Sequence, residues 1–138
     1  LILLLAVMVI IAFSGCINQE PPEPPGGYEC DNQTDGDQLI MITDGMVIDQ
    51  NVCEARGVKD KIMVFHSPGC PACAIAVPIL EELENETDYE FEFIDVSDGR
   101  ERMMEIGLIP AKIPTVVIKC KVHVGARSKE EYRSLIEG

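Results

Sequence analysis

Apolar and polar residues follow one another in regular blocks along the second half of the chain. Unbroken apolar runs at 62–65 and 115–118 are typical of buried strands, and the second run is almost entirely β-branched. The full pattern predicts strands over 62–65, 91–96, 115–118 and 122–124, and helices over 70–83, 100–106 and 128–136. Ser128 and Glu131 have the spacing of a capping box at the start of the last helix. The order β-α-β-α-β-β-α predicts an α/β domain of three layers, with a central mixed sheet flanked by helices.

Another pair of apolar runs precedes this domain. Residues 39–42 and 46–48 flank Thr43-Asp44-Gly45, which is typical of a hairpin turn. We therefore expect an N-terminal extension with a hairpin over residues 28–60, ahead of a domain over residues 61–138.

Residues 1–13 are apolar and uncharged, and Ser14, Gly15 and Cys16 follow them. As a helix this run reaches about 20 Å, short of a bilayer core of roughly 30 Å, which is the size of a signal-peptide hydrophobic stretch. The ending resembles a lipoprotein signal, in which Cys16 is lipidated and becomes the mature N-terminus. An uncleaved anchor is the alternative, because the chain starts without Met or a basic leader and upstream residues would lengthen the span. Residues 1–15 are thus interpreted as a signal peptide or a membrane anchor.

Residues 16–27 contain four prolines and two glycines. Such a segment neither pairs in a sheet nor continues a helix, so it predicts an extended tether. A signal or anchor, a tether and a folded domain together predict an extracytoplasmic protein that is held at the cell membrane.

Composition and charge exclude several functions. The 138 residues include 24 acidic and 11 basic side chains, which gives a formal net charge of −13. This charge does not fit a nucleic-acid binder, which needs a basic face, and it argues against electrostatic docking on anionic lipid. Six cysteines in so short a chain indicate an oxidising compartment or dedicated thiol chemistry.

The candidate chemistry lies in Cys70-Pro71-Ala72-Cys73, at the junction between a predicted strand and a predicted helix. Unpaired backbone N–H groups and the positive end of the helix dipole stabilise a thiolate on the first cysteine. The spacing of three brings the second thiol within reach for disulfide closure, so the pair is suited to rapid thiol–disulfide exchange.

Three other interpretations of the pair remain. A zinc site needs four ligands, and only one such pair is present, so we expect no zinc site. A structural disulfide is a second interpretation. Copper capture is the most serious alternative, because Cu(I) favours two thiol ligands, and it would make the chain a metallochaperone-type module.

Residues 61–138 resemble the thioredoxin family. The segment 70–83 is similar to the family's active-site helix, including Pro78 eight residues after the first cysteine. Residues 113–115 resemble its cis-proline turn, and residues 124–126 with the final helix resemble its C-terminal segment. The proline inside the motif is similar to the Cys-Pro-x-Cys of glutaredoxins and extracytoplasmic oxidoreductases.

The resemblance implies a role for each site residue. Cys70 would be the exposed nucleophile, and Cys73 would resolve the mixed disulfide. Pro114, in the cis form, would pack over the pair and leave the backbone of Ile113 free to bind an extended substrate segment. Pro71 would lie beside them at the substrate site.

The chain departs from the family around the motif. Val64 occupies the position of a commonly buried acid, and His66 and Gly69 stand where the family has tryptophans. Without the acid, the proton relay for Cys73 must come from water or another group, and thiolate formation at Cys70 is easier because an anionic neighbour is missing. A protonated His66 would add to that effect, or this loop histidine has no role.

The resemblance also implies a second disulfide. In a thioredoxin-like sheet the strand before the active site lies antiparallel to the strand after the cis-proline, which brings Cys53 and Cys120 to neighbouring ends. We expect a Cys53–Cys120 disulfide that stabilises the fold by roughly 3–4 kcal/mol through loop closure. Cys30 is the alternative partner of either cysteine.

Taken together, the chain is predicted to be an extracytoplasmic, membrane-tethered thiol–disulfide oxidoreductase. It would exchange disulfides with protein thiols and with a further redox partner. We expect a monomer that needs no metal and no organic cofactor, since no phosphate-cradling glycine loop is present.

Overall fold

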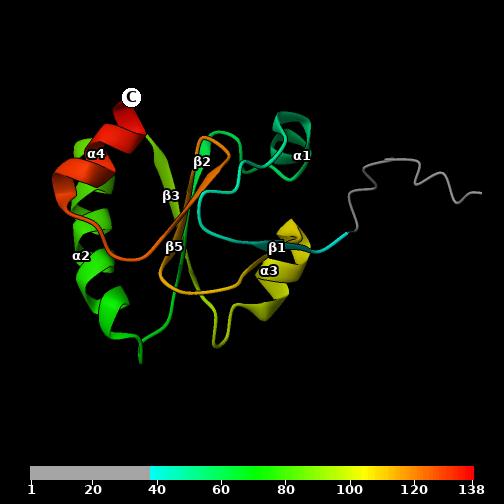
Figure 1. Ribbon diagram of the computed structural model, residues 1–138, viewed down its shortest axis with the longest axis horizontal. Coiled ribbons are helices and arrows are strands. Elements are labelled where there is room, and N and C mark those ends of the chain that lie inside the picture. Colours follow the sequence, from blue (N-terminus) through cyan, green and yellow to red (C-terminus); the bar gives the residue numbers. More distant parts are fainter. Residues whose placement is uncertain (1–37) are drawn as a thin grey trace, which may run out of the picture. The chain divides into compact units, whose positions relative to one another are not determined.

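The computed structural model describes residues 38–138 (Figure 1). In chain order the elements are β1 (Ile40–Ile42), α1 (Gln50–Ala55), β2 (Lys61–His66), α2 (Pro71–Glu86), β3 (Glu90–Asp95), α3 (Arg100–Ile106), β4 (Leu108–Pro110), β5 (Thr115–Ile118), β6 (Lys121–Val124) and α4 (Lys129–Glu137). The predicted signal or anchor (1–15), the tether (16–27), Cys16 and Cys30 lie outside the described residues. Within residues 38–138, no helix combines the length and the apolar character needed to cross a membrane.

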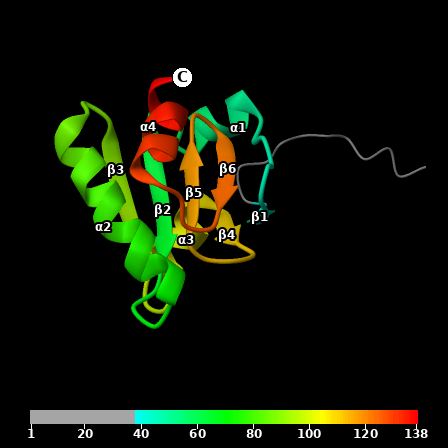
Figure 2. The ribbon, with the colours of Figure 1, turned by 60° about the vertical axis from the view of Figure 1, so that its left-hand side comes forward.

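The central sheet has the order β3-β2-β5-β6, which is visible in Figure 2. β2 runs parallel to β3 and antiparallel to β5, and β5 runs antiparallel to β6. The predicted mixed sheet is confirmed. The register pairs Phe65 with Thr115, so the end of β2 lies beside the start of β5.

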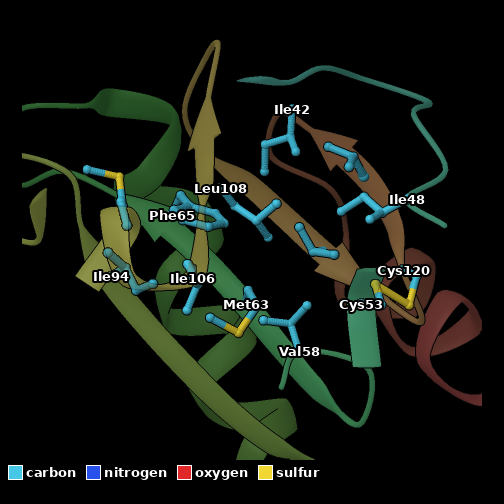
Figure 3. Packing of buried hydrophobic residues seen from close by; sticks show 13 residues of the cluster. Ile42, Ile48, Cys53, Val58, Met63, Phe65, Ile94, Ile106, Leu108 and Cys120 are labelled. Atoms are coloured by element: carbon cyan, nitrogen blue, oxygen red, sulfur yellow. A yellow bond between two sulfur atoms is a disulfide. The ribbon is translucent and has the colours of Figure 1, made fainter. Parts of the chain in front are cut away.

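Two hydrophobic clusters occupy the two faces of this sheet. Figure 1 shows the resulting three layers, with α2 and α4 on one side of the sheet and α1 and α3 on the other. Side chains alternate along β2, because successive residues of a strand point to opposite faces. Ile62 and Val64 pack with α2 and α4, whereas Met63 and Phe65 pack with α1 and α3. Figure 3 shows the second of these clusters, with Phe65 and Met63 among Ile106, Leu108 and Val58. The predicted α/β sandwich of three layers is confirmed.

The predicted hairpin at residues 39–48 does not form. Its turn exists, since the Met46 N–H donates to the Thr43 carbonyl at 3.1 Å and Gly45 has φ +74°. The two flanking runs, however, do not pair with each other. β1 pairs in parallel with β4, and the second run bonds to β6, where the Val122 N–H donates to the Met46 carbonyl at 2.8 Å. The edge of β6 offers unpaired backbone groups to this run, and buried backbone groups need such partners.

The segment before β2 contributes to the core of the domain. Ile42, Ile48, Cys53 and Val58 are all buried in the same cluster as Phe65. The short helix α1, which the pattern did not predict, begins after Asp49, whose carboxylate accepts the N–H groups of Asn51 and Val52. The residues of this segment that the structure describes therefore belong to the layer that covers one face of the sheet.

Arg56, just after α1, ties distant parts of this layer together. Its guanidinium donates to the carbonyls of Gln38 at 2.6 Å and Ile106 at 3.1 Å, and also to the carbonyl of Gly107. These carbonyls belong to the approach to β1 and to the end of α3. The side chain of Arg56 thus links its own segment to two others, the approach to β1 and the end of α3.

The predicted capping box at the start of α4 is confirmed. The Ser128 hydroxyl accepts the Glu131 N–H at 3.2 Å, and the Glu131 carboxylate accepts the Ser128 N–H at 2.8 Å. Tyr132 and Ile136 are buried against α2, as their spacing indicates. The cap and the apolar stripe together place α4 beside α2 on one face of the sheet.

Candidate active site

The site lies where β2 ends and α2 begins. Cys70 is the N-cap of α2 and has extended backbone dihedrals, φ −96° and ψ 113°, while Pro71 occupies the first helical turn. Proline is well tolerated there because the N–H groups of the first turn have no helical partner. One of these unpartnered groups, the Cys73 N–H, donates a hydrogen bond to Cys70 Sγ at 3.1 Å. The sulfur of Cys70 is therefore in direct contact with the electropositive end of the helix.

The two sulfurs of the motif form a disulfide, with 5.1 Å between the Cα atoms. Cys70 is half-buried, whereas only 2% of Cys73 is exposed. A substrate can thus reach the first sulfur more easily than the second. This asymmetry matches the roles expected for an attacking and a resolving cysteine.

The turn that contains Ile113 and Pro114 lies against this disulfide. The Ile113–Pro114 bond is cis, and Pro114 is buried. The carbonyl oxygen of Ile113 is 3.8 Å from Cys70 Sγ. Among the described residues, the backbone groups of Ile113 make no hydrogen bond to other backbone groups. An extended peptide can use these groups in the manner of an added strand.

The strand beside the Cys70–Cys73 pair carries Val64 at the position where a buried acid is common in thioredoxins. Val64 is fully buried on β2 and faces α2, so no carboxylate occupies that position. His66 is the last residue of β2, and its ring lies edge-on to Phe93 with 6.3 Å between the ring centres. Gly69 is exposed in the turn before Cys70.

A second disulfide joins Cys53 in α1 to Cys120 in the β5–β6 turn, with 6.1 Å between the Cα atoms. Both side chains are fully buried, and Figure 3 shows them at the edge of the cluster. Lys119 and Cys120 have positive φ values of 49° and 63°, which fit a two-residue hairpin turn. This disulfide lies within a core cluster, in contrast to the disulfide at the start of α2, whose Cys70 is partly exposed.

The pattern of residues did not reveal a cavity beside Cys73. His66, Ser67, Ala74, Val77 and Pro78 line it together with Cys73. From the sequence, His66 is expected to act only on Cys70 or to have no role. The signal that could have indicated the cavity is Pro78, because a proline inside a helix deprives a carbonyl one turn earlier of its donor.

A mixed four-stranded sheet between helices, with a Cys-x-x-Cys disulfide at a helix N-terminus whose first cysteine is partly exposed, defines a thioredoxin-like protein. Comparison with known proteins supports this class. The glutaredoxin family model matches residues 62–124. The chain is 40% identical over 75 residues to the thioredoxin of Methanocaldococcus jannaschii, a match that covers 52% of this chain and 86% of that protein.

Two further relatives give similar matches. A probable thioredoxin of Methanothermobacter thermautotrophicus is 38% identical over 73 residues, which cover 51% of this chain and 84% of that protein. A probable thioredoxin of Methanothermobacter marburgensis is 36% identical over 74 residues, which cover 51% of this chain and 85% of that protein. The chain belongs to the thioredoxin-like superfamily and is a thiol–disulfide oxidoreductase.

Proposed function

We propose that Cys70 attacks disulfides of protein substrates, that Cys73 resolves the mixed disulfide, and that the enzyme works outside the cytoplasm while tethered to the cell membrane. The observation that carries the assignment of roles is the N-cap position of Cys70. Its sulfur accepts a helix N–H at 3.1 Å and is more exposed than its partner. The same interaction is stronger with a thiolate, because the acceptor is then charged.

The reaction has two exchange steps. In the first, the Cys70 thiolate attacks one sulfur of the substrate disulfide, forms a mixed disulfide, and releases the other substrate sulfur as a thiolate. In the second, Cys73 loses its proton and attacks Cys70 Sγ, which closes the Cys70–Cys73 disulfide and releases the second substrate thiol. Two electrons pass from the cysteine pair to the substrate, and the reverse sequence oxidises a substrate dithiol.

The turn before β5 suits an extended substrate segment. The backbone groups of Ile113, which have no backbone partner within residues 38–138, would pair with the residues that flank the substrate cysteine, next to Cys70 Sγ. Pro71 is exposed beside Cys70 and supplies apolar contact without a backbone donor, while the buried Pro114 fixes the turn that presents Ile113. Backbone pairing tolerates many side chains, so the substrates would be proteins of varied sequence.

The Cys73→Ser variant tests the roles of the two cysteines. It should accumulate mixed disulfides through Cys70 with reduction-sensitive partners, since the resolving thiol is missing. Cys70→Ser is the matched control and should trap far less. The copper-binding alternative predicts another result: Cys73→Ser would weaken Cu(I) binding and trap no protein. That result would refute the proposed exchange reaction.

The proposed location is supported by the apolar run over residues 1–13, by Cys16 and by the proline-rich tether. The buried Cys53–Cys120 disulfide adds support, because structural disulfides persist mainly in oxidising compartments. Full-length protein expressed with a labelled fatty acid should carry the label and fractionate with membranes. Cys16→Ser should lose the label, and membrane retention without it would favour an uncleaved anchor. A soluble cytoplasmic wild-type protein would refute the tether.

The direction of electron flow can be assigned from the reduction potential of the Cys70–Cys73 pair. A value of about −270 mV would indicate a reductase, and one of about −120 mV would indicate an oxidant.

A further inference from the structure

An open cavity of about 220 Å³ is lined in part by Cys73, the less exposed cysteine of the active site. Its walls come from the end of β2 and from the first two turns of α2. The residues that matter here are His66, Ser67, Cys73, Ala74 and Pro78. The cavity therefore brings an imidazole and the resolving thiol to the same solvent-filled space.

Cys73 needs a proton acceptor to complete the reaction. Its side chain is only 2% exposed, and burial in apolar surroundings disfavours the thiolate that must attack Cys70 Sγ. The neighbouring strand position is Val64, which is fully buried and cannot take up a proton. The acceptor must then lie elsewhere around the sulfur.

His66 is the titratable side chain besides Cys73 among the residues that line the cavity. An imidazole nitrogen can accept a proton and give it up again, so this side chain can exchange a proton with a thiol. From the adjacent strand, Asp95 stands opposite His66 in the register of β2 and β3, and the ring of Phe93 lies edge-on to that of His66. From α2, the residues that line this space are uncharged.

Asp95 places a carboxylate next to His66. Hydrogen bonds from the Ser97 hydroxyl and backbone N–H lower the pKa of Asp95, and the positive charge of His66 acts in the same direction. The carboxylate of Asp95 is therefore the nearest charged group to His66 on the adjacent strand.

The cavity also offers partners for the water that must connect the two groups. Pro78 has no N–H, so the Ala74 carbonyl lacks its usual helical donor, and both residues line this space. The Ser67 hydroxyl is a further donor and acceptor. A cavity of this volume holds several waters, and each needs two to four polar partners of the kind found here.

We propose that His66 accepts the proton of Cys73 through water in this cavity. This inference rests on the roles proposed above for Cys70 and Cys73. In the resolving step the Cys73 S–H bond breaks, its proton passes through water to the imidazole, and the sulfur's electron pair forms the bond to Cys70 Sγ. The bond from Cys70 to the substrate sulfur breaks, and the substrate leaves as a thiolate. The imidazolium then returns its proton to solvent or to the departing thiolate.

A stopped-flow reaction of the reduced protein with dithiobis(nitrobenzoate) separates the two steps. In protein that also carries Cys16→Ser and Cys30→Ser, attack by Cys70 releases one coloured thiolate in a first phase, and resolution by Cys73 releases a second. His66→Gln should slow the second phase by about tenfold or more near neutral pH and change the first by less than about threefold. The difference should shrink at high pH, where hydroxide ionises Cys73 directly. His123→Gln, at the second of the two histidines, is the matched control and should behave as wild type.

Chemical rescue of the His66→Ala variant by imidazole distinguishes proton transfer by His66 from a purely structural role of this residue. Added imidazole should accelerate its second phase in proportion to concentration, because the free base can enter the vacated space. An unchanged second phase in His66→Gln would overturn the inference, and so would a slowing that is equal at every pH and insensitive to imidazole. If wild-type protein shows no second phase, or if Cys70→Ser keeps the first, the roles of the cysteines are wrong instead.

Discussion

Breaking the Cys53–Cys120 disulfide should remove a large part of the stability of the fold. The two cysteines are 67 residues apart, and closing a loop of that length in the unfolded chain accounts for about 4 kcal/mol at 25 °C. Both side chains are fully buried, so replacing a sulfur by hydrogen adds a smaller packing cost of about 1 kcal/mol. Cys53→Ala or Cys120→Ala alone should each lower the free energy of unfolding by about 4–5 kcal/mol.

The double variant separates the contribution of loop closure from that of side-chain packing. Either single substitution already opens the loop, so Cys53→Ala with Cys120→Ala should cost only about 1 kcal/mol more than one substitution. Guanidinium unfolding followed by circular dichroism measures these differences, with Cys16, Cys30, Cys70 and Cys73 replaced by Ser in every variant to prevent disulfide exchange. The slope of the transition should also rise, because the unfolded chain without the bridge is more expanded.

Two results would refute this account of the bridge. Costs that simply add in the double variant would mean that the two residues contribute packing and no loop closure. Alkylation of Cys53 in native, unreduced protein would mean that the bond is not formed in solution.

Other contacts give smaller and more local effects. Arg102 lowers the pKa of Glu92 below its ordinary value of 4.5, so their pairing contributes stability above about pH 4.5 that is lost as the pH falls through the lowered pKa. Arg102→Gln should therefore be less stable than wild type by about 0.5–1 kcal/mol at neutral pH and equal to it in acid, measured by thermal unfolding at both pH values. Arg56→Lys should lose about 1–2 kcal/mol in chemical unfolding, since an ammonium cannot reach all of the carbonyls that the guanidinium binds. Ser128→Ala should cost about 1 kcal/mol in the same assay, and Ser128→Asp should recover most of it because aspartate also caps helices.

The elements that could be predicted from the sequence are those with their own periodicity. β2 is a continuous apolar run because both of its faces are buried, and α4 shows a cap followed by one apolar stripe. Each of these signals lies within a few neighbouring residues. The order of such elements then limits the arrangement to a three-layer sandwich.

The elements that were missed depend on distant partners. β1 has three residues, and its pairing strand β4 begins 66 residues after Ile42, so a local turn at Gly45 suggested the wrong neighbour. α1 has six residues, which is too short for a periodic pattern to be recognised. The contacts of Arg56 join three segments at once, and no local spacing marks a side chain of that kind.

The active site likewise has one part that is local in the sequence and another that depends on distant partners. The reactive pair is local: a sulfur at the N-cap and a second one turn later follow from Cys70, Pro71 and Cys73 alone. What surrounds the pair is set by the pairing of β2 with its two neighbours. Phe65 opposite Thr115 brings the Ile113 carbonyl to Cys70, and a shift of one residue in that register would turn the wrong faces of the strand toward α2. The other neighbour, β3, brings Asp95 beside His66. The two sulfurs could therefore be assigned from their spacing, whereas the groups that bind a substrate and move a proton become visible only once the strands are aligned.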